Sequence, residues 1–205
     1  NWQWQNKKVR LENLPFCQIP LANAATALAA VQYLPFDISE QTLRKSLQEV
    51  ELVGRFQAIK ADRRKKLADY LGVPVEILPT IIVDVGHNPH AAKYLSEKLT
   101  ALKHSIEGKI IAVCGMLKDK DANGVFAHLT PIIDEWHCVT LGGYRGQSGD
   151  ELADKLKSHF PHIQAKSDNS VMDGMRTALK SAVKNDVVLV FGSFHTVAEF
   201  WSVVE

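Results

Sequence analysis

The sequence predicts an α/β fold, in which a doubly wound, mostly parallel sheet follows a shorter helical segment. From Val75 onward, short β-rich apolar runs alternate with amphipathic stretches, which is the pattern of parallel strands joined by crossover helices. The first fifty residues carry two helical patterns instead. We therefore expect a helical segment at residues 1–52 and an α/β domain at residues 53–205.

The N-terminal segment contains an alanine-rich run, "IPLANAATALAAVQYL", which favours a helix. A second helix is expected from about Ser39 to Val50, where Leu43 and Leu47 lie one turn apart. Two helices cannot form a domain alone, and the chain begins with Asn1 rather than Met. We therefore interpret the segment as the end of a larger domain, although processing of the chain would look the same.

A basic segment follows the expected boundary near Val50 to Val53. Between Lys60 and Leu78, four basic residues stand in a row at positions 63–66, and Gly72 is a possible helix C-cap. We interpret this segment as a solvated surface helix. It is preceded by Gly54 and Arg55, which separate the second helix from a short expected strand.

The α/β region carries five strand patterns and clear helix starts. Asn88 before Pro89 fits an N-cap followed by the first helical position, and Ser148 with Glu151 fits a capping box. The expected strands are Thr80 to Val85, Lys109 to Cys114, Trp136 to Leu141, His162 to Ala165 and Asp186 to Phe191.

Composition argues against several classes of function. The 24 Lys and Arg residues against 23 Asp and Glu residues give a net charge of +1, which would not hold a nucleic acid or an anionic membrane surface. Cys17, Cys114 and Cys138 lie far apart in apolar runs, so we expect buried thiols in a reducing cytoplasm. No apolar run approaches the ~18 residues of a membrane span.

Polar residues follow three of the expected strands. Asp84 and His87 follow the first, Lys118 to Asp121 follow the second, and Ser193, His195 and Thr196 follow the last. Ligands of open α/β sheets bind where strands end and helices begin. Each signal alone also fits ordinary turn formers and helix caps, and no G-x-S-x-G motif supports a serine nucleophile. Together they predict a binding site at one edge of the sheet.

Five strings taken in order resemble a known family. They are "LANAATAL", "GRFQ", "DVGHNPHAA", "GMLKDKD" and "GSFHTVAEF". Together they resemble the bacterial bifunctional dihydrofolate synthase/folylpolyglutamate synthases of the Mur ligase superfamily, from about Trp2 to Val204. The resemblance implies a Rossmann-like C-terminal, glutamate-ligase domain, preceded by the end of a central ATP-binding domain.

The resemblance also implies a reaction and its ligands. ATP with Mg²⁺ phosphorylates a carboxylate of dihydropteroate or a folate, and the amine of L-glutamate attacks the acyl phosphate to form an amide, ADP and phosphate. The parent enzyme is expected to be a cytoplasmic monomer. The implied ATP-binding residues are Asn23, Arg55, Asp84 and His87; the implied glutamate-binding residues are Lys120, Ser193 and His195; His87 and Lys120 would be catalytic.

One motif of such ligases is missing from this chain. No G-x-x-x-x-G-K-[ST] string, whose amides would cradle the ATP phosphates, occurs in it. We therefore expect the phosphate loop, the magnesium ligands and the pterin pocket in an N-terminal part of the same protein, and no turnover by this chain alone. The alternative is a stand-alone module that binds a nucleotide or an amino acid without catalysis.

Overall fold

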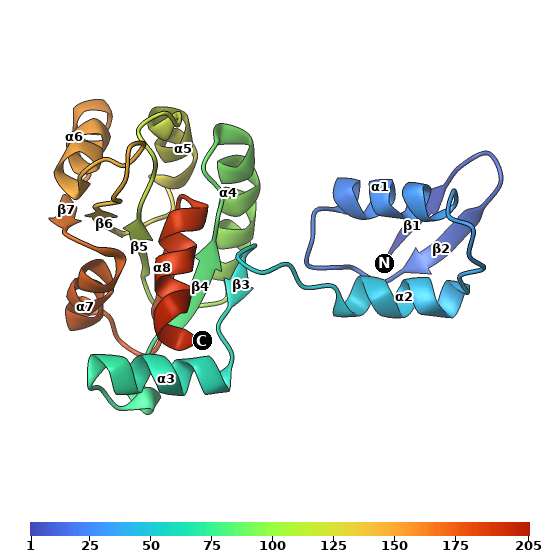
Figure 1. The fold of residues 1–205 in the computed structure, drawn as a ribbon, viewed down its shortest axis with the longest axis horizontal. Helices are drawn as coiled ribbons and strands as arrows, with labels where there is room; N and C mark the ends of the chain where they lie inside the picture. Colours follow the sequence, from blue (N-terminus) through green and yellow to red (C-terminus); the bar gives the residue numbers. More distant parts are fainter. The chain divides into compact units, whose positions relative to one another are not determined.

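The computed structural model describes all residues, 1–205, and divides the chain into two compact units, Asn1–Arg55 and Phe56–Glu205 (Figure 1). Each unit has its own hydrophobic core, so each is described by itself. The division falls between Arg55 and Phe56, a few residues after the boundary expected from the sequence.

The first unit contains more than the two expected helices. Helices α1 (Leu21–Val31) and α2 (Glu40–Glu49) accompany an antiparallel pair of strands, β1 (Trp2–Gln5) and β2 (Arg10–Leu14). Both expected helices are present, and the strand pair was not predicted from the sequence. Its strands are mostly polar and exposed, so their few inward residues gave no apolar run. The core consists of Trp4, Leu11, Leu14, Ala24, Leu28 and Leu47.

The second unit is built on a six-stranded sheet with the order β3-β4-β8-β5-β6-β7. The edge strand β3 is antiparallel to its neighbour and all other pairs are parallel, which confirms the expected α/β, mostly parallel fold. Strand β8 returns to the middle of the sheet, between β4 and β5. The strands are β3 (Gln57–Ala58), β4 (Thr80–Asp84), β5 (Ile110–Cys114), β6 (Glu135–Val139), β7 (Ala165–Asp168) and β8 (Val187–Phe191).

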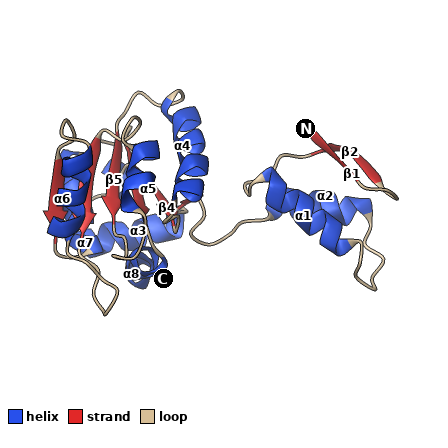
Figure 2. Ribbon diagram, turned by 90° about the horizontal axis from the view of Figure 1, so that it is seen from above, coloured by secondary structure: helices blue, strands red, loops and turns tan.

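Helices flank both faces of this sheet (Figure 2). Alternate strand residues point to opposite faces, so Ile82 and Ile81 belong to different cores. The core containing Ile82 includes residues of α4 (Pro89–Lys103), α5 (Ala122–Leu129) and α6 (Gly149–His159). The core containing Ile81 includes residues of α3 (Ala61–Leu71), α7 (Val171–Ser181) and α8 (Phe194–Val204).

Three helix ends lie where local signals in the sequence predicted them. Asn88 Oδ1 accepts a hydrogen bond from the Ala91 amide at 2.9 Å, Ser148 and Glu151 form a capping box, and Gly72 is left-handed with φ of 70°. The expected strand His162 to Ala165 was wrong, because the strand is β7 at Ala165–Asp168. This edge strand is polar and largely exposed, so it lacks the apolar run that marks a central strand.

The basic helix α3 is more than a solvated surface helix. Leu67 is fully buried, and the Arg63 guanidinium lies 4.4 Å from the ring centroid of Trp201 on α8. Arg64 donates hydrogen bonds to the carbonyls of Pro79 and Leu78 at 2.6 and 2.8 Å. Two of its four consecutive basic residues therefore fasten the helix to the domain. No helix in the chain is both long and apolar enough to cross a membrane.

Candidate functional site at the carboxyl edge of the sheet

The three polar strand ends meet at one edge of the sheet. In the parallel register, Asp84 of β4 lies beside Phe191 of β8, which lies beside Cys114 of β5. The turns after these strands also touch, because Thr196 Oγ1 donates to the Gly115 carbonyl at 2.6 Å and the rings of His87 and Phe194 lie 6.4 Å apart. This confirms the expectation that the three strand ends share one edge.

Asp84 organises the backbone at this edge. Its side chain is 7% exposed, Oδ1 accepts from the Gly86 amide at 2.6 Å, and Oδ2 accepts from the Phe56 amide at 2.8 Å. Arg55 is joined covalently to that Phe56 amide nitrogen. Both neighbours of Arg55 have positive φ, 69° at Gly54 and 43° at Phe56, the latter unusual for a non-glycine residue. The carboxylate thus fixes the backbone at which the Arg55 segment enters the second unit.

The turn after β4 positions His87 and begins α4. His87 Nδ1 lies 2.9 Å from the Val85 carbonyl, and its ring is tilted by 57° to that of Phe194. Asn88 and Pro89 then start α4, whose first amide groups have no partner within the helix. The N-terminal end of such a helix favours negative charge, which suits an anionic ligand at this edge.

Ser193 caps helix α8 at the same edge. It is 3% exposed, and its Oγ accepts from the Thr196 amide at 3.0 Å as the N-cap of α8. Its hydroxyl also lies 2.8 Å from Thr196 Oγ1, which gives its own hydrogen to the Gly115 carbonyl. The Ser193 hydrogen is therefore used inside the protein, and this side chain holds two turns together. His195, by contrast, is exposed.

Two glycines let these turns approach. Gly192 has φ of 113°, and a Cβ there would lie 2.6 Å from the Gly115 carbonyl oxygen. A Cβ on Gly115 would lie 2.6 Å from Thr196 Oγ1. A side chain at Gly192 would push the turn after β8 away from the end of β5, and a side chain at Gly115 would displace Thr196.

Lys120 belongs to a charged cluster after β5. Its Nζ lies 3.3 Å from Asp119 Oδ2, and Arg145, from the loop after β6, bonds both oxygens of Asp119 at 3.1 and 2.6 Å. The Arg145 hydrogen bonds lower the pKa of Asp119 to about 2. Sequence reasoning missed Arg145; its position between glycines in "GGYRGQS", directly after a strand, was the available signal.

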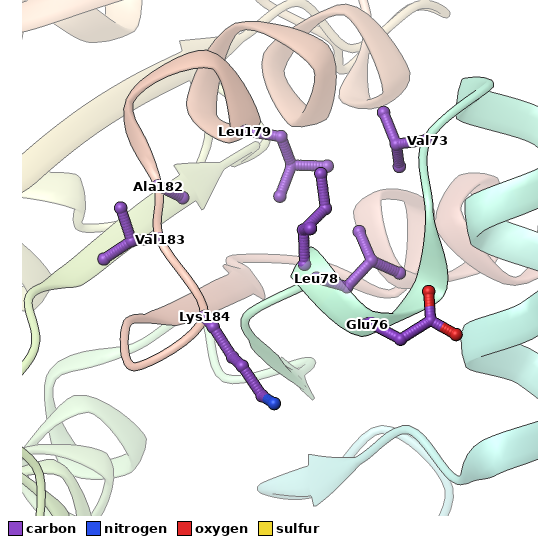
Figure 3. Close-up of a pocket in the computed structure, with 8 residues that line it drawn as sticks. Val73, Glu76, Leu78, Leu179, Ala182, Val183 and Lys184 are labelled. Carbon is purple, nitrogen blue, oxygen red and sulfur yellow. The ribbon is translucent and has the colours of Figure 1, made fainter.

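Grooves lie near both edges of the sheet in the second unit. A polar one of about 460 Å³ lies by the carboxyl edge, where Lys118 from the turn after β5, Gln147 and residues of α6 line it. An apolar one of about 330 Å³ lies before β4 and β8, at the opposite edge of the sheet, where Leu78, Leu179 and Val183 line it and Glu76 and Lys184 add opposite charges (Figure 3). No group of three or more His, Cys, Asp or Glu side chains could hold a metal ion.

Comparison with known proteins places this geometry in a family. Residues 74–194 match the family described as Mur ligase, glutamate ligase domain. The chain is 93% identical over all its 205 residues to a dihydrofolate synthase/folylpolyglutamate synthase of Haemophilus influenzae, and covers 47% of that protein. It therefore spans about half the length of the curated relatives it matches.

Solved structures agree with this assignment. The structure of an Escherichia coli protein of this kind in complex with ADP aligns with 99% of this chain, and the alignment covers 44% of the Escherichia coli chain. The TM-score is 0.81 and the sequence identity is 37%. A bifunctional folylpolyglutamate synthase/dihydrofolate synthase with Mn, AMPPNP and L-glutamate bound matches 98% of the chain and 43% of its own, with a TM-score of 0.79 and 40% identity. The family match and the carboxyl-edge geometry agree: the chain belongs to the Mur ligase family and carries its glutamate ligase domain.

Proposed function

We propose that this chain forms part of an ATP-dependent ligase that joins L-glutamate to dihydropteroate, to folates, or to both, through an acyl phosphate. The observation that carries the proposal is the meeting of the ends of β4, β8 and β5, with Asp84 and His87 on one turn and Lys120 on another. The two solved relatives hold ADP, or AMPPNP with Mn and L-glutamate. The whole reaction is a property of a protein about twice as long.

The side chains of the proposed ATP-binding residues suit the three parts of ATP, which are the adenine, the ribose and the phosphates. Asn23, exposed on α1, offers an amide to the adenine, and Asp84 offers carboxylate oxygens to ribose hydroxyls. Exposed Arg55 offers a permanent cation with parallel N–H groups to phosphate oxygens. His87, beside the start of α4, is the fourth proposed ATP-binding residue. Bound ATP would supply the phosphoryl group that activates the substrate carboxylate.

The proposed glutamate pocket centres on Lys120 and His195. Asp119 is already paired with Arg145, so Lys120 keeps positive charge for a substrate carboxylate. Ser193 is the third proposed glutamate-binding residue, and its Oγ also caps α8 at the same edge. Magnesium would be held by the rest of the parent protein, because the charged groups here do not cluster as ligands.

The test is a hybrid in which this chain replaces the matching 205 residues of the Haemophilus influenzae relative. ADP release that requires both dihydropteroate and glutamate is expected from the hybrid, and none from the chain alone. Arg55→Ala should lower turnover by about 10²-fold, because it removes a cation aimed at developing phosphate charge. Arg176→Ala, an exposed arginine on α7, is the matched control and should leave turnover unchanged.

Two outcomes would overturn the proposal. A hybrid that folds and binds nucleotide but releases no ADP would contradict ligase function. Micromolar nucleotide binding by the chain alone, measured by calorimetry, together with that inactive hybrid would favour a stand-alone binding module instead.

A further inference from the structure

We propose that Arg145 is a positioning residue for the ligase reaction, acting through Asp119 on Lys120. By occupying both oxygens of Asp119, its guanidinium keeps the Lys120 ammonium available to a substrate carboxylate. This role rests on the proposed ligase function, which it deepens. Two separate loops bring the three side chains together: Asp119 and Lys120 follow β5, and Arg145 lies in the loop after β6.

The two cations bind Asp119 unequally. Arg145 donates from Nη2 to Oδ2 at 2.6 Å and from Nε to Oδ1 at 3.1 Å, so its guanidinium takes both carboxylate oxygens. Lys120 Nζ lies 3.3 Å from Oδ2 alone, the oxygen that Arg145 holds at the shorter distance. The Arg145 hydrogen bonds lower the pKa of Asp119 to about 2, so this carboxylate is ionised at neutral pH. Asp119 is therefore paired mainly with Arg145.

The net charge of this cluster depends on Arg145. Two cations and one carboxylate leave one positive charge in excess, which an incoming carboxylate can neutralise. Without Arg145, Asp119 and Lys120 would form a pair with no excess charge. Asp119 would then compete with the substrate carboxylate for the N–H groups of Lys120 and would repel it.

The other charged residues of the same turn have different contacts. Asp121 Oδ1 accepts a hydrogen bond from the Gly124 amide at 2.9 Å, as the N-cap of α5. Lys118 Nζ lies 5.0 Å from the ring centroid of Tyr144. Neither side chain takes the place of Arg145 on Asp119.

The loop that carries Arg145 is anchored without the Arg145 side chain. The Arg145 carbonyl accepts the Lys118 amide at 3.0 Å, and buried Gln147 donates from Nε2 to the Met116 carbonyl at 2.7 Å. Truncation of the exposed Arg145 side chain leaves both contacts between the two loops in place. Such a variant therefore tests the charge of Arg145 separately from the position of the loop.

The first measurement is carbon-13 NMR of the aspartate carboxyl groups in this chain. Between about pH 7 and 3.5, the Asp119 signal should stay nearly constant in the unaltered chain, because its pKa is about 2. In Arg145→Ala the pKa should rise toward the ordinary value of 3.8, so that the signal has moved by at least about a quarter of its range at pH 3.5. Arg176→Ala breaks another exposed pair, with Asp173, and should leave the Asp119 signal unchanged.

The same Asp119 titration in the unaltered chain and in Arg145→Ala would overturn the proposal, because Arg145 would then not hold this carboxylate. This measurement does not depend on ligase activity.

The second measurement uses the hybrid ligase. Arg145→Ala should lower kcat/KM for glutamate by about 5-fold while KM for ATP stays within about 2-fold, since the pairs involved are exposed to solvent. Adding Asp119→Asn to Arg145→Ala removes the carboxylate that competes for Lys120. The double variant should therefore recover kcat/KM for glutamate to within about 2-fold of the unaltered hybrid.

The double variant distinguishes a role of charge from a merely structural role. If Arg145 only held the two loops together, a second substitution could not restore activity, and a double variant as impaired as Arg145→Ala would overturn the proposal. Unchanged kcat/KM in Arg145→Ala would overturn it as well. An inactive hybrid would overturn the ligase function and the substrate part of this proposal with it, whereas the Asp119 titration would still show whether Arg145 holds Asp119.

Discussion

At each edge of the sheet in the second unit, one buried aspartate accepts hydrogen bonds from two backbone amides. At the carboxyl edge, Asp84 accepts the amides of Phe56 and Gly86; at the amino edge, Asp186 accepts the amides of Lys109 and Val183, each at 2.6 to 2.8 Å. Both carboxylates are nearly buried, at 7% and 4% exposed. Each satisfies amide groups from separate segments of chain.

The difference lies in what surrounds each carboxylate. At the amino edge, Asp134 accepts the Ile110 amide, Arg64 satisfies the carbonyls before β4, and the remaining groove is apolar. At the carboxyl edge, His87, Lys120 and His195 remain accessible in turns that glycines bring together. We call the amino edge closed, because these polar groups are paired within the protein, and the carboxyl edge open, because these polar side chains are accessible. The carboxyl edge is where open α/β sheets generally bind ligands.

The strongest test of this difference between the two edges is to replace each carboxylate separately. Asp84→Ala and Asp186→Ala should each lower the free energy of unfolding of the second unit by about 2–3 kcal/mol, because each leaves two amides without an acceptor. In the hybrid ligase, only Asp84→Ala should also reduce turnover, by about 10²-fold, since it loses the proposed ribose contact. Urea denaturation and ADP release at low temperature measure the two effects.

Hydrogen exchange of the β8 amides would report the second unit without interference from the first. Equal loss of turnover in both variants would mean that the activity tracks stability, and the functional distinction between the edges would be lost. Asp84→Asn and Asp186→Asn serve as milder partners, because each keeps one acceptor oxygen.

A glycine at the carboxyl edge provides the next prediction. Gly192→Ala should cost about 2 kcal/mol, because φ of 113° is unfavourable for alanine and the new Cβ would meet the Gly115 carbonyl oxygen at 2.6 Å. Gly143→Ala is the matched control, since Gly143 has φ of 87° but nothing within 4 Å of a Cβ. Equal urea midpoints for the two variants would show that the close approach of β5 and β8 contributes no stability.

The open edge was easier to predict from sequence than the closed one. Strong apolar runs ending in Asp84, Cys114 and Phe191 located three strand ends, and parallel pairing then required them to share an edge. The return of β8 to the middle of the sheet could not be read this way, because apolar runs of similar composition fit any central position. Strand β7 was misplaced since its polar residues resemble a loop.

The hydrogen-bond and ion-pair partners of side chains were less predictable from the sequence than the strand ends. Ser193 has the residue type of a carboxylate binder and of a helix N-cap. The sequence does not show that its neighbour Thr196 contacts Gly115, 81 residues away. Arg145 was missed because its partner Asp119 is 26 residues distant. Such pairs depend on tertiary placement, whereas the caps at Asn88 and Ser148 lie within three residues of their partners.

The smallest predicted effect concerns Glu135, the first residue of β6, whose side chain is mostly buried. Burial raises the pKa of Glu135, yet hydrogen bonds from Lys166, His137 and Ser181 outweigh burial and leave that pKa below its ordinary value of 4.5. A carboxyl group with a lowered folded-state pKa adds stability that is present above the unfolded-state pKa and is lost as pH falls through the folded-state pKa.

Glu135→Gln should therefore flatten the loss of stability below about pH 4.5, by ~1 kcal/mol or less. Urea midpoints of the two proteins between about pH 3 and 6 would test this. If the urea midpoints of Glu135→Gln and of the unaltered chain fell in parallel with decreasing pH, this network would not contribute to the loss of stability in acid.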